Sequence, residues 1–124
     1  MAISQLRSRR KPSGARYKKI VKKLRNKGNL PTLTGIGKLR KTAAKTRGGH
    51  IKQRILKTDI ANIYDPKLKK YFKSKIESVI DAPSNRNFVR RNIMTKGTII
   101  KTEKGNAKIT SRPGQEGTVN AILV

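Results

Sequence analysis

The pattern of apolar and polar positions divides the 124-residue chain into a helix-like segment and a longer β-like region. In "SGARYKKIVKKLRNKG" (13–28), apolar side chains recur at i, i+3, i+4 and i+7, which is one face of a helix: Tyr17, Ile20, Val21 and Leu24. This spacing predicts a helix over residues 17–25, although the lysines on its other faces repel one another when no counterion is present. The next stretch, "NLPTLTGIG" (29–37), is interrupted by proline and glycine and predicts a linker.

From residue 39 onward the pattern favours short β-strands. The runs "LRKTAAKT" and "IKQRILKT" flank "RGGH" (47–50), and glycine supplies the positive φ angles that a tight turn needs. This arrangement predicts a β-hairpin. The run "DIANIYD" extends or restarts the second strand before a turn at Asp65-Pro66.

Strict alternation marks residues 72–80 as a half-buried strand. One side carries Phe72, Ser74, Ile76, Ser78 and Ile80, and the other carries Lys73, Lys75, Glu77 and Val79. After the turn-like "DAPSNRN", three more β runs follow, namely "TIIKT", "NAKIT" and "TVNAILV". Together these runs predict a mainly β fold: a small antiparallel β-barrel-like domain over residues 38–124, preceded by a basic, extended arm over residues 1–37.

Charge separates the two parts more sharply than hydropathy does. The whole chain has a net charge of +26. Residues 1–58 carry nineteen Lys and Arg residues and no acid, whereas residues 59–124 carry thirteen basic and six acidic residues. A positive charge of this size destabilises the free compact state and attracts polyanions. We therefore expect an anionic partner, and we expect the arm not to fold on its own.

The residues that catalysis requires are scarce. His50 is the single histidine, and its place beside two glycines predicts a turn residue or a phosphate contact rather than a general base. The nearest set of carboxylates matches no metal-binding motif, so we expect Asp59 and Glu77 to pair with lysines and Asp65 and Asp81 to shape turns. The sequence predicts no enzyme activity, no metal and no cofactor.

Two further classes of function find little support. The segment "GIGKLRK" lacks the G-x-x-x-x-G-K-[ST] spacing of a phosphate-binding loop. Cysteine is absent, no apolar run approaches the roughly 20 residues of a membrane span, and the N-terminus has no signal-peptide pattern. We therefore expect a soluble, intracellular protein. We do not expect it to bind a membrane surface, because the apolar face of the helix predicted over 17–25 is narrow and lacks tryptophan.

Four basic clusters carry the positive signal: "RSRRK", "YKKIVKKLRNK", "KTRGGHIKQR" and "NRNFVRRN". One such cluster alone would be read as a solvated surface, but four in a chain with six acids favour a nucleic acid. The five aromatic residues are scattered, with no cluster like the stacking motifs of single-strand RNA modules. Structured RNA fits best because its close-packed helices form narrow anionic channels, and a DNA-coating protein is the alternative that composition leaves open.

Four motifs then point to a family. The chain closely resembles the eight-e family of small-subunit ribosomal proteins in four motifs, which occur in this order: "SRRKPSG", "KTRGGHIKQRIL", "PSNRNFVRRNIMTKG" and "ITSRPGQEGTVNAILV". Its compact length resembles that of the archaeal members. The resemblance implies a non-enzymatic protein of the cytoplasmic ribosome, bound to small-subunit ribosomal RNA and to neighbouring ribosomal proteins, and not an independent homo-oligomer. His50 and Ala15 depart from the asparagine and glycine usual in the family.

The resemblance and the basic clusters together predict one set of RNA contacts, which falls into an arm group and a β-domain group. The arm group comprises Arg7, Arg9, Arg10, Lys11, Arg16, Lys18, Lys19 and Lys22. The β-domain group comprises Arg47, Gly48, Gly49, His50, Lys52, Arg54, Asn85, Arg86, Arg90, Arg91, Lys96 and Arg112. Arginine is weighted above lysine because its planar fork makes bidentate phosphate contacts.

Overall fold

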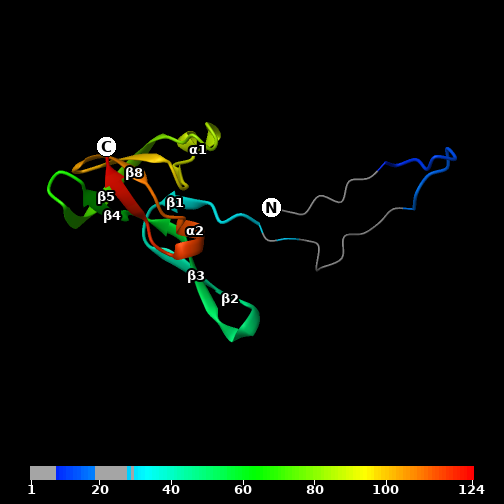
Figure 1. Cartoon of the computed structure of the whole chain (residues 1–124), viewed down its shortest axis with the longest axis horizontal. Helices are drawn as coiled ribbons and strands as arrows, with labels where there is room; N and C mark the ends of the chain where they lie inside the picture. The colour runs from blue at the N-terminus through cyan, green and yellow to red at the C-terminus, as the bar shows by residue number, and fades with distance from the viewer. Residues whose placement is uncertain (1–7, 19–27, 29) are drawn as a thin grey trace. The chain divides into compact units, whose positions relative to one another are not determined.

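A computed structural model describes residues 8–18, 28 and 30–124 of the chain. The chain divides into two units, residues 1–31 and residues 32–124 (Figure 1). The helix predicted over 17–25 lies outside the described residues, apart from its first two positions.

The described part of the smaller unit contains a tight turn that the basic pattern did not predict. Gly14 N donates to Lys11 O at 3.0 Å, and Lys11 N donates to Ala15 O at 2.7 Å. Pro12 fixes its own φ for the first corner of the turn, and Gly14 takes the positive φ of 79° that follows it. Arg10 and Arg16 consequently face each other across a short antiparallel bridge.

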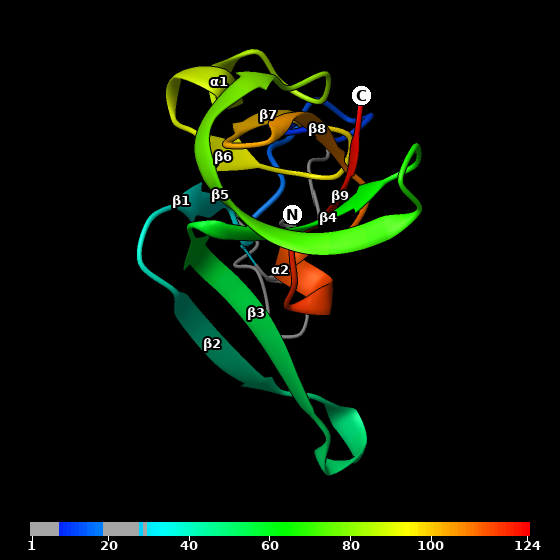
Figure 2. The ribbon, with the colours of Figure 1, turned by 90° about the vertical axis from the view of Figure 1, so that its left-hand side faces the viewer.

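A four-stranded sheet forms the first part of the larger unit. Its strand order is β2-β3-β1-β6, with bounds Arg40–Lys45, Ile51–Thr58, Thr34–Ile36 and Ile93–Met94 respectively. Strands β2 and β3 pair antiparallel, which confirms the predicted hairpin, and this hairpin projects away from the rest of the unit (Figure 2). Strand β1 pairs with β3 and β6, so the linker prediction for 29–37 is wrong over Thr34–Ile36.

The second part is a closed five-stranded barrel, which confirms the predicted fold class. Its strand order is β4-β5-β7-β8-β9, with bounds Ile60–Asp65, Lys70–Asp81, Ile99–Thr102, Gly105–Ile109 and Asn120–Leu123 respectively. Neighbouring strands pair antiparallel except at the closure, where β4 and β9 run parallel. One residue, Asp59, separates β3 from β4, so the second hairpin strand restarts as the first barrel strand.

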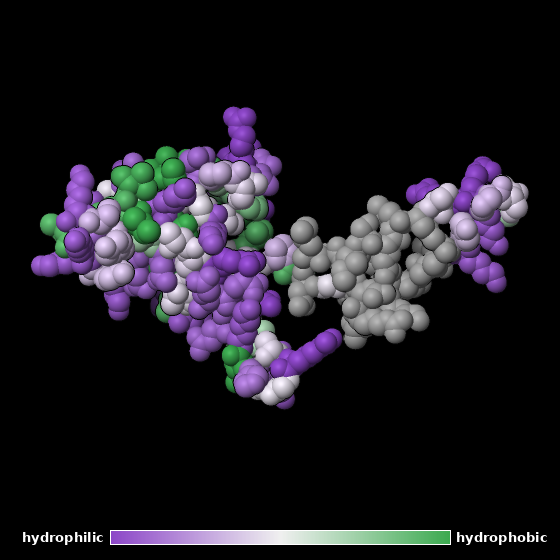
Figure 3. All heavy atoms as spheres, in the orientation of Figure 1, coloured by the Kyte–Doolittle hydropathy of each residue, from purple (hydrophilic) through white to green (hydrophobic). Residues whose placement is uncertain are grey.

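The core fills the barrel with small aliphatic side chains. Ile63, Ile100, Ala61 and Ala107 are fully buried, and Met94 joins the same cluster from β6 in the neighbouring sheet. The low apolar content of the sequence therefore suffices because a closed barrel has no free edge and a narrow interior. Hydrophilic side chains cover most of the visible face of this unit (Figure 3).

The alternation predicted for residues 72–80 holds as far as Ser78 and then inverts. Strand β5 shifts register against β7 between Ile76 and Ser78 and again between Val79 and Asp81. Val79 is consequently buried and Ile80 is 44% exposed, so the sides assigned to these two residues in the sequence are wrong. A register shift of this kind adds a residue to one strand and cannot be read from periodicity alone.

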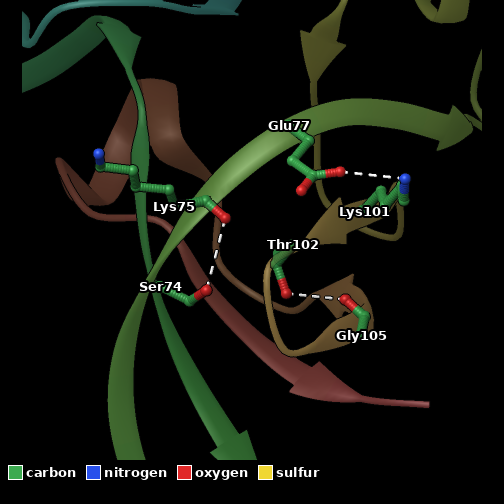
Figure 4. Close-up of polar contacts among 6 residues, drawn as sticks. All are labelled: Ser74, Lys75, Glu77, Lys101, Thr102 and Gly105. Carbon is green, nitrogen blue, oxygen red and sulfur yellow. Dashed lines mark hydrogen bonds and ion pairs between the residues drawn. The ribbon is translucent and has the colours of Figure 1, made fainter.

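Carboxylates serve the fold in two ways. Glu77 on β5 forms an ion pair with Lys101 on β7, at 3.1 Å (Figure 4). Close to this pair, the hydroxyl of Thr102 donates to Gly105 O at 2.7 Å and closes the turn after β7. Asp65 Oδ1 accepts from Lys67 N at 2.8 Å, as expected of a turn residue. Within the described ranges Asp59 makes no ion pair with a lysine, so the pairing predicted for it is not observed there.

The described part of the unit also contains two short α-helices, α1, Asn87–Arg90, and α2, Pro113–Glu116. Neither these nor any other helix in the described part of the chain has the length and apolarity to cross a membrane.

Replacing Ile100 by alanine tests the barrel core. Ile100 is fully buried, so Ile100→Ala should lower the free energy of unfolding by about 2–5 kcal/mol, as measured by urea denaturation of the full chain. Leu68→Ala is the control because Leu68 is 67% exposed, and it should change stability by less than about 0.5 kcal/mol. Equal losses for the two variants would contradict this description of the core.

Candidate nucleic-acid interface

The tip of the β2–β3 hairpin is built from the "RGGH" motif. Arg47–Gly49 form a single 3-10 turn, and Gly48 and Gly49 both take a φ of 83°. Thr46 closes the turn, since its backbone N–H and its hydroxyl both donate to His50 O, at 2.8 and 2.9 Å. His50 is therefore a turn residue, and an exposed one, as the sequence predicts.

The "SRPGQEG" motif braces the base of this hairpin. Helix α2 packs against β3, and Lys52 Nζ donates to Gln115 Oε1. Gly117 has a φ of 72°, and a Cβ atom there would lie 3.3 Å from Gln53 O, so the close approach favours glycine. Arg112 directly precedes α2 and is exposed. Lys52 and Arg54 are half-buried on β3.

The "PSNRNFVRRN" motif forms a separate platform around α1. Asn85 Oδ1 accepts from Asn87 N at 2.9 Å, which starts the helical turn. Phe88 and Val89 pack against the barrel core. The neighbouring cationic side chains therefore point outward, and all of them are exposed: Arg86, Arg90 and Arg91.

Asn92 ties this platform to the inversion in β5. Its backbone φ is 49°, a value that is uncommon for residues other than glycine. Its side-chain Oδ1 accepts a hydrogen bond from Val79 N at 3.2 Å. The last asparagine of the motif thus stabilises the fold, in contrast to the arginines before it.

Lys96 joins the platform through a hydroxyl contact. Ser84 Oγ lies 3.1 Å from Thr95 Oγ1, and Thr95 Oγ1 lies 3.0 Å from Thr98 Oγ1. These contacts connect the turn that carries Lys96 to the loop that carries Asn85. Lys96 itself is exposed.

The structure therefore sorts the predicted contacts into groups. The hairpin group comprises Arg47, Gly48, Gly49, His50, Lys52, Arg54 and Arg112, and the platform group comprises Asn85, Arg86, Arg90, Arg91 and Lys96. The hairpin tip and α1 lie at opposite ends of the larger unit (Figure 2), so the two groups do not form one site. Arg9, Arg10, Lys11, Arg16 and Lys18 are exposed in the smaller unit, whereas Arg7, Lys19 and Lys22 lie outside the described residues.

Within the described ranges the only ion pair is Lys101–Glu77, so no cationic side chain of the hairpin and platform groups is ion-paired. Glu116 Oε1 accepts from the backbone N of Arg112 at 3.1 Å. The same ranges contain no group of three or more histidine or acidic side chains that could hold a metal ion. Both groups therefore present positive charge that no ion pair neutralises, and the hairpin tip places two exposed glycines next to Arg47.

The sequence missed one feature on the barrel surface. Tyr64 and Tyr71 lie together with their ring centroids 4.7 Å apart, although the aromatic residues look scattered along the chain. They contribute to a groove of about 630 Å³ on the outer face of the barrel, which we term the aromatic groove; its lining includes Asn62, Tyr64, Tyr71, Lys73, Asn120 and Ile122. The signal was present in the sequence as two tyrosines that flank the Asp65-Pro66 turn at positions that face each other across a hairpin.

Comparison with known families then decides the relationship. The family model described as "Ribosomal protein S8e" matches residues 4–124. The chain belongs to this family.

Individual relatives agree over nearly the whole length. The chain is 46% identical to the small ribosomal subunit protein eS8 of Methanococcoides burtonii, over 97% of each chain. It is 44% identical to the eS8 of Picrophilus torridus over 100% of each chain, and 47% identical to that of Nanoarchaeum equitans over 78% of this chain and 76% of the relative. The resemblance that the four motifs predicted is thus confirmed, and these relatives are archaeal.

Two substitutions within one motif should separate structural from surface roles. Asn92→Ala removes the acceptor for Val79 N and leaves a non-glycine residue at positive φ, so it should lower the free energy of unfolding by about 1–3 kcal/mol. Arg90→Ala, at an exposed position, should change it by less than about 0.5 kcal/mol. Urea denaturation measures both, and a larger loss for Arg90→Ala would overturn the assignment.

Proposed function

We propose that the chain is a structural constituent of the small ribosomal subunit and binds small-subunit ribosomal RNA, without catalysing a reaction. The full-length match to the S8e family carries this proposal, because the relatives are small-subunit ribosomal proteins. The proposal places the protein in the cytoplasmic ribosome, with ribosomal RNA and neighbouring subunit proteins as partners, and not as an independent homo-oligomer.

The exposed cations supply the binding chemistry in this proposal. Arg47 presents a guanidinium fork at the tip of a projecting hairpin, and Gly48 and Gly49 beside it have no side chains to obstruct a phosphate. A Cβ atom at Gly49 would meet no atom within 4 Å, so this part of the tip faces open space. The hairpin thereby fits between two RNA helices, where phosphates approach from both sides.

The platform group docks the other end of the β domain. Arg86, Arg90 and Arg91 extend from a short helix whose apolar residues are partly buried and pack against the core, so their backbone positions are fixed before binding. Preorganised cations lose less freedom on binding than cations on a flexible loop. Two separated anchors set the orientation of the domain on the RNA as well as its affinity.

The arm has a different task from the β domain. We assign neutralisation and threading between helices to residues 1–37, and docking and register to residues 38–124. Strand β1 is where the arm joins the sheet, through pairing with β3 and β6. RNA that binds the arm also offsets the mutual repulsion of its charges, so ordering of the arm is coupled to binding.

Sedimentation of an archaeal lysate that contains the tagged full chain tests the proposal. We expect the chain to migrate with the small subunit and to remain there through a moderate-salt wash. Migration with the DNA-containing fraction, and absence from the subunit, would replace the ribosomal reading with a DNA-coating one.

Salt dependence tests the phosphate contacts. With roughly 6–10 such contacts, affinity for small-subunit ribosomal RNA should fall by about 10³–10⁵ between 50 and 200 mM salt. Arg47→Ala should reduce the slope of log affinity against log salt by about 1.

Lys101→Ala is the matched control for Arg47→Ala. It removes the same charge, but from a lysine that Glu77 already neutralises, and the slope should not change. A nearly flat dependence for the wild-type chain, or equal changes in the two variants, would contradict the proposed contacts.

A further inference from the structure

The strand register of the barrel brings residues of four strands into two rows on its outer face. In the first row Tyr71, Tyr64, Ile122 and Lys108 lie side by side on β5, β4, β9 and β8. In the second row Lys73, Asn62 and Asn120 lie side by side on β5, β4 and β9. Because each row is two residues from the other along every strand, both point to the same face. The two rows form the aromatic groove and extend it with Lys108.

Tyr71 provides an open aromatic surface in this groove. Its side chain is 79% exposed, an unusual position for a large ring on a small domain, and Tyr64 supports it at a tilt of 36°. The neighbouring Phe72 is not open in the same way, because Lys104 Nζ lies 3.9 Å from its ring centroid and its side chain packs against the core. Tyr71 is therefore the ring that can receive a planar ligand.

The second row supplies hydrogen-bonding groups next to that ring. Asn62 Nδ2 donates to Asn120 Oδ1 at 3.0 Å, which fixes the orientation of the two amides relative to each other. One N–H of Asn62 and both N–H groups of Asn120 have no partner among the described residues. Paired amides of this kind can read the edge of a base, since an amide carries both a donor and an acceptor.

Charge determines which class of ligand fits. Lys73 and Lys108 flank the groove on β5 and β8, and none of the acidic side chains that the structure describes lines it. An anionic, aromatic ligand with a polar edge matches this set, and an unpaired nucleotide is such a ligand. A peptide would leave the lysines unpaired unless it were acidic as well as aromatic.

We propose that the aromatic groove binds an unpaired nucleotide of the ribosomal RNA, with its base stacked on Tyr71, its edge at Asn62 and Asn120, and its phosphate at Lys73. The inference rests on the proposed function, because it takes the RNA partner from there. It adds a contact of a different kind, since stacking responds little to salt whereas phosphate binding responds strongly.

Ultraviolet cross-linking of the full chain to transcribed archaeal small-subunit ribosomal RNA tests the site directly. We expect nucleotide adducts on the peptide that contains Tyr71. Tyr71→Ala should lower the affinity for the same RNA by about 5- to 150-fold, the range expected for loss of one stacked base. The salt slope should not change, because no charge is removed.

Two variants control for structure and for general apolar contact. Tyr71→Phe keeps the ring and should bind within about twofold of wild type. Leu68→Ala removes another exposed apolar side chain from the turn before β5 and should have no effect. Circular dichroism of all three variants should match the wild-type chain, since both positions are exposed.

The outcomes separate this inference from the proposed function. If the wild-type chain binds the RNA but Tyr71→Ala binds equally well, or the adducts form only elsewhere, the groove proposal is wrong and the ribosomal role stands. If Tyr71 cross-links to a neighbouring protein in intact subunits in place of a nucleotide, the groove is a protein interface and the proposal is overturned. If the wild-type chain fails to bind ribosomal RNA at all, the proposed function fails first.

Discussion

The parallel pairing of β4 with β9 is the contact on which the rest of the larger unit depends. It joins the first barrel strand to the last one, so it removes both free edges and encloses the aliphatic core. The same pairing aligns Asn62 with Asn120 and Tyr64 with Ile122, which creates the aromatic groove. It also brings the loop before β9 back to β3, where α2 supports the hairpin. Closure, groove and hairpin support are therefore consequences of one pairing.

Repulsion among the positive charges destabilises this compact arrangement, and the positions of the charged side chains reduce that repulsion. A net charge of +26 on 124 residues opposes collapse, and a small core can offset little repulsion. In the fold, the charged side chains lie on projecting or exposed segments. The hairpin carries its cations away from the barrel, and α1 exposes its arginines while Phe88 and Val89 pack against the core. The part of the chain that the structure describes thus folds with a single ion pair, and its remaining positive charge is available to a partner.

Local patterns predicted much of the fold and of the candidate site. Alternation and turn residues identified the hairpin at "RGGH", the strand over 72–80 and the three C-terminal strands, because each of these signals lies within a few residues. Features that arise from pairing between distant segments were missed. Strand β1 has only three residues and is a strand because it pairs with β3 and β6. The Tyr64–Tyr71 pair forms only once the turn between the two residues closes. The inversion at Val79 depends on Asn92, thirteen residues further along the chain.

The single residue between β3 and β4 has a consequence for how the family can vary in length. The hairpin strand β3 continues almost directly into the barrel. Its eight residues therefore fix the distance between the tip and the barrel wall at about 26 Å. An insertion in β3 changes that length and, if it is odd in number, also turns every following side chain to the opposite face. Viable length changes in the hairpin should therefore occur in even numbers and in both strands together. The distance from the barrel wall to the hairpin tip would then change in steps of about 7 Å.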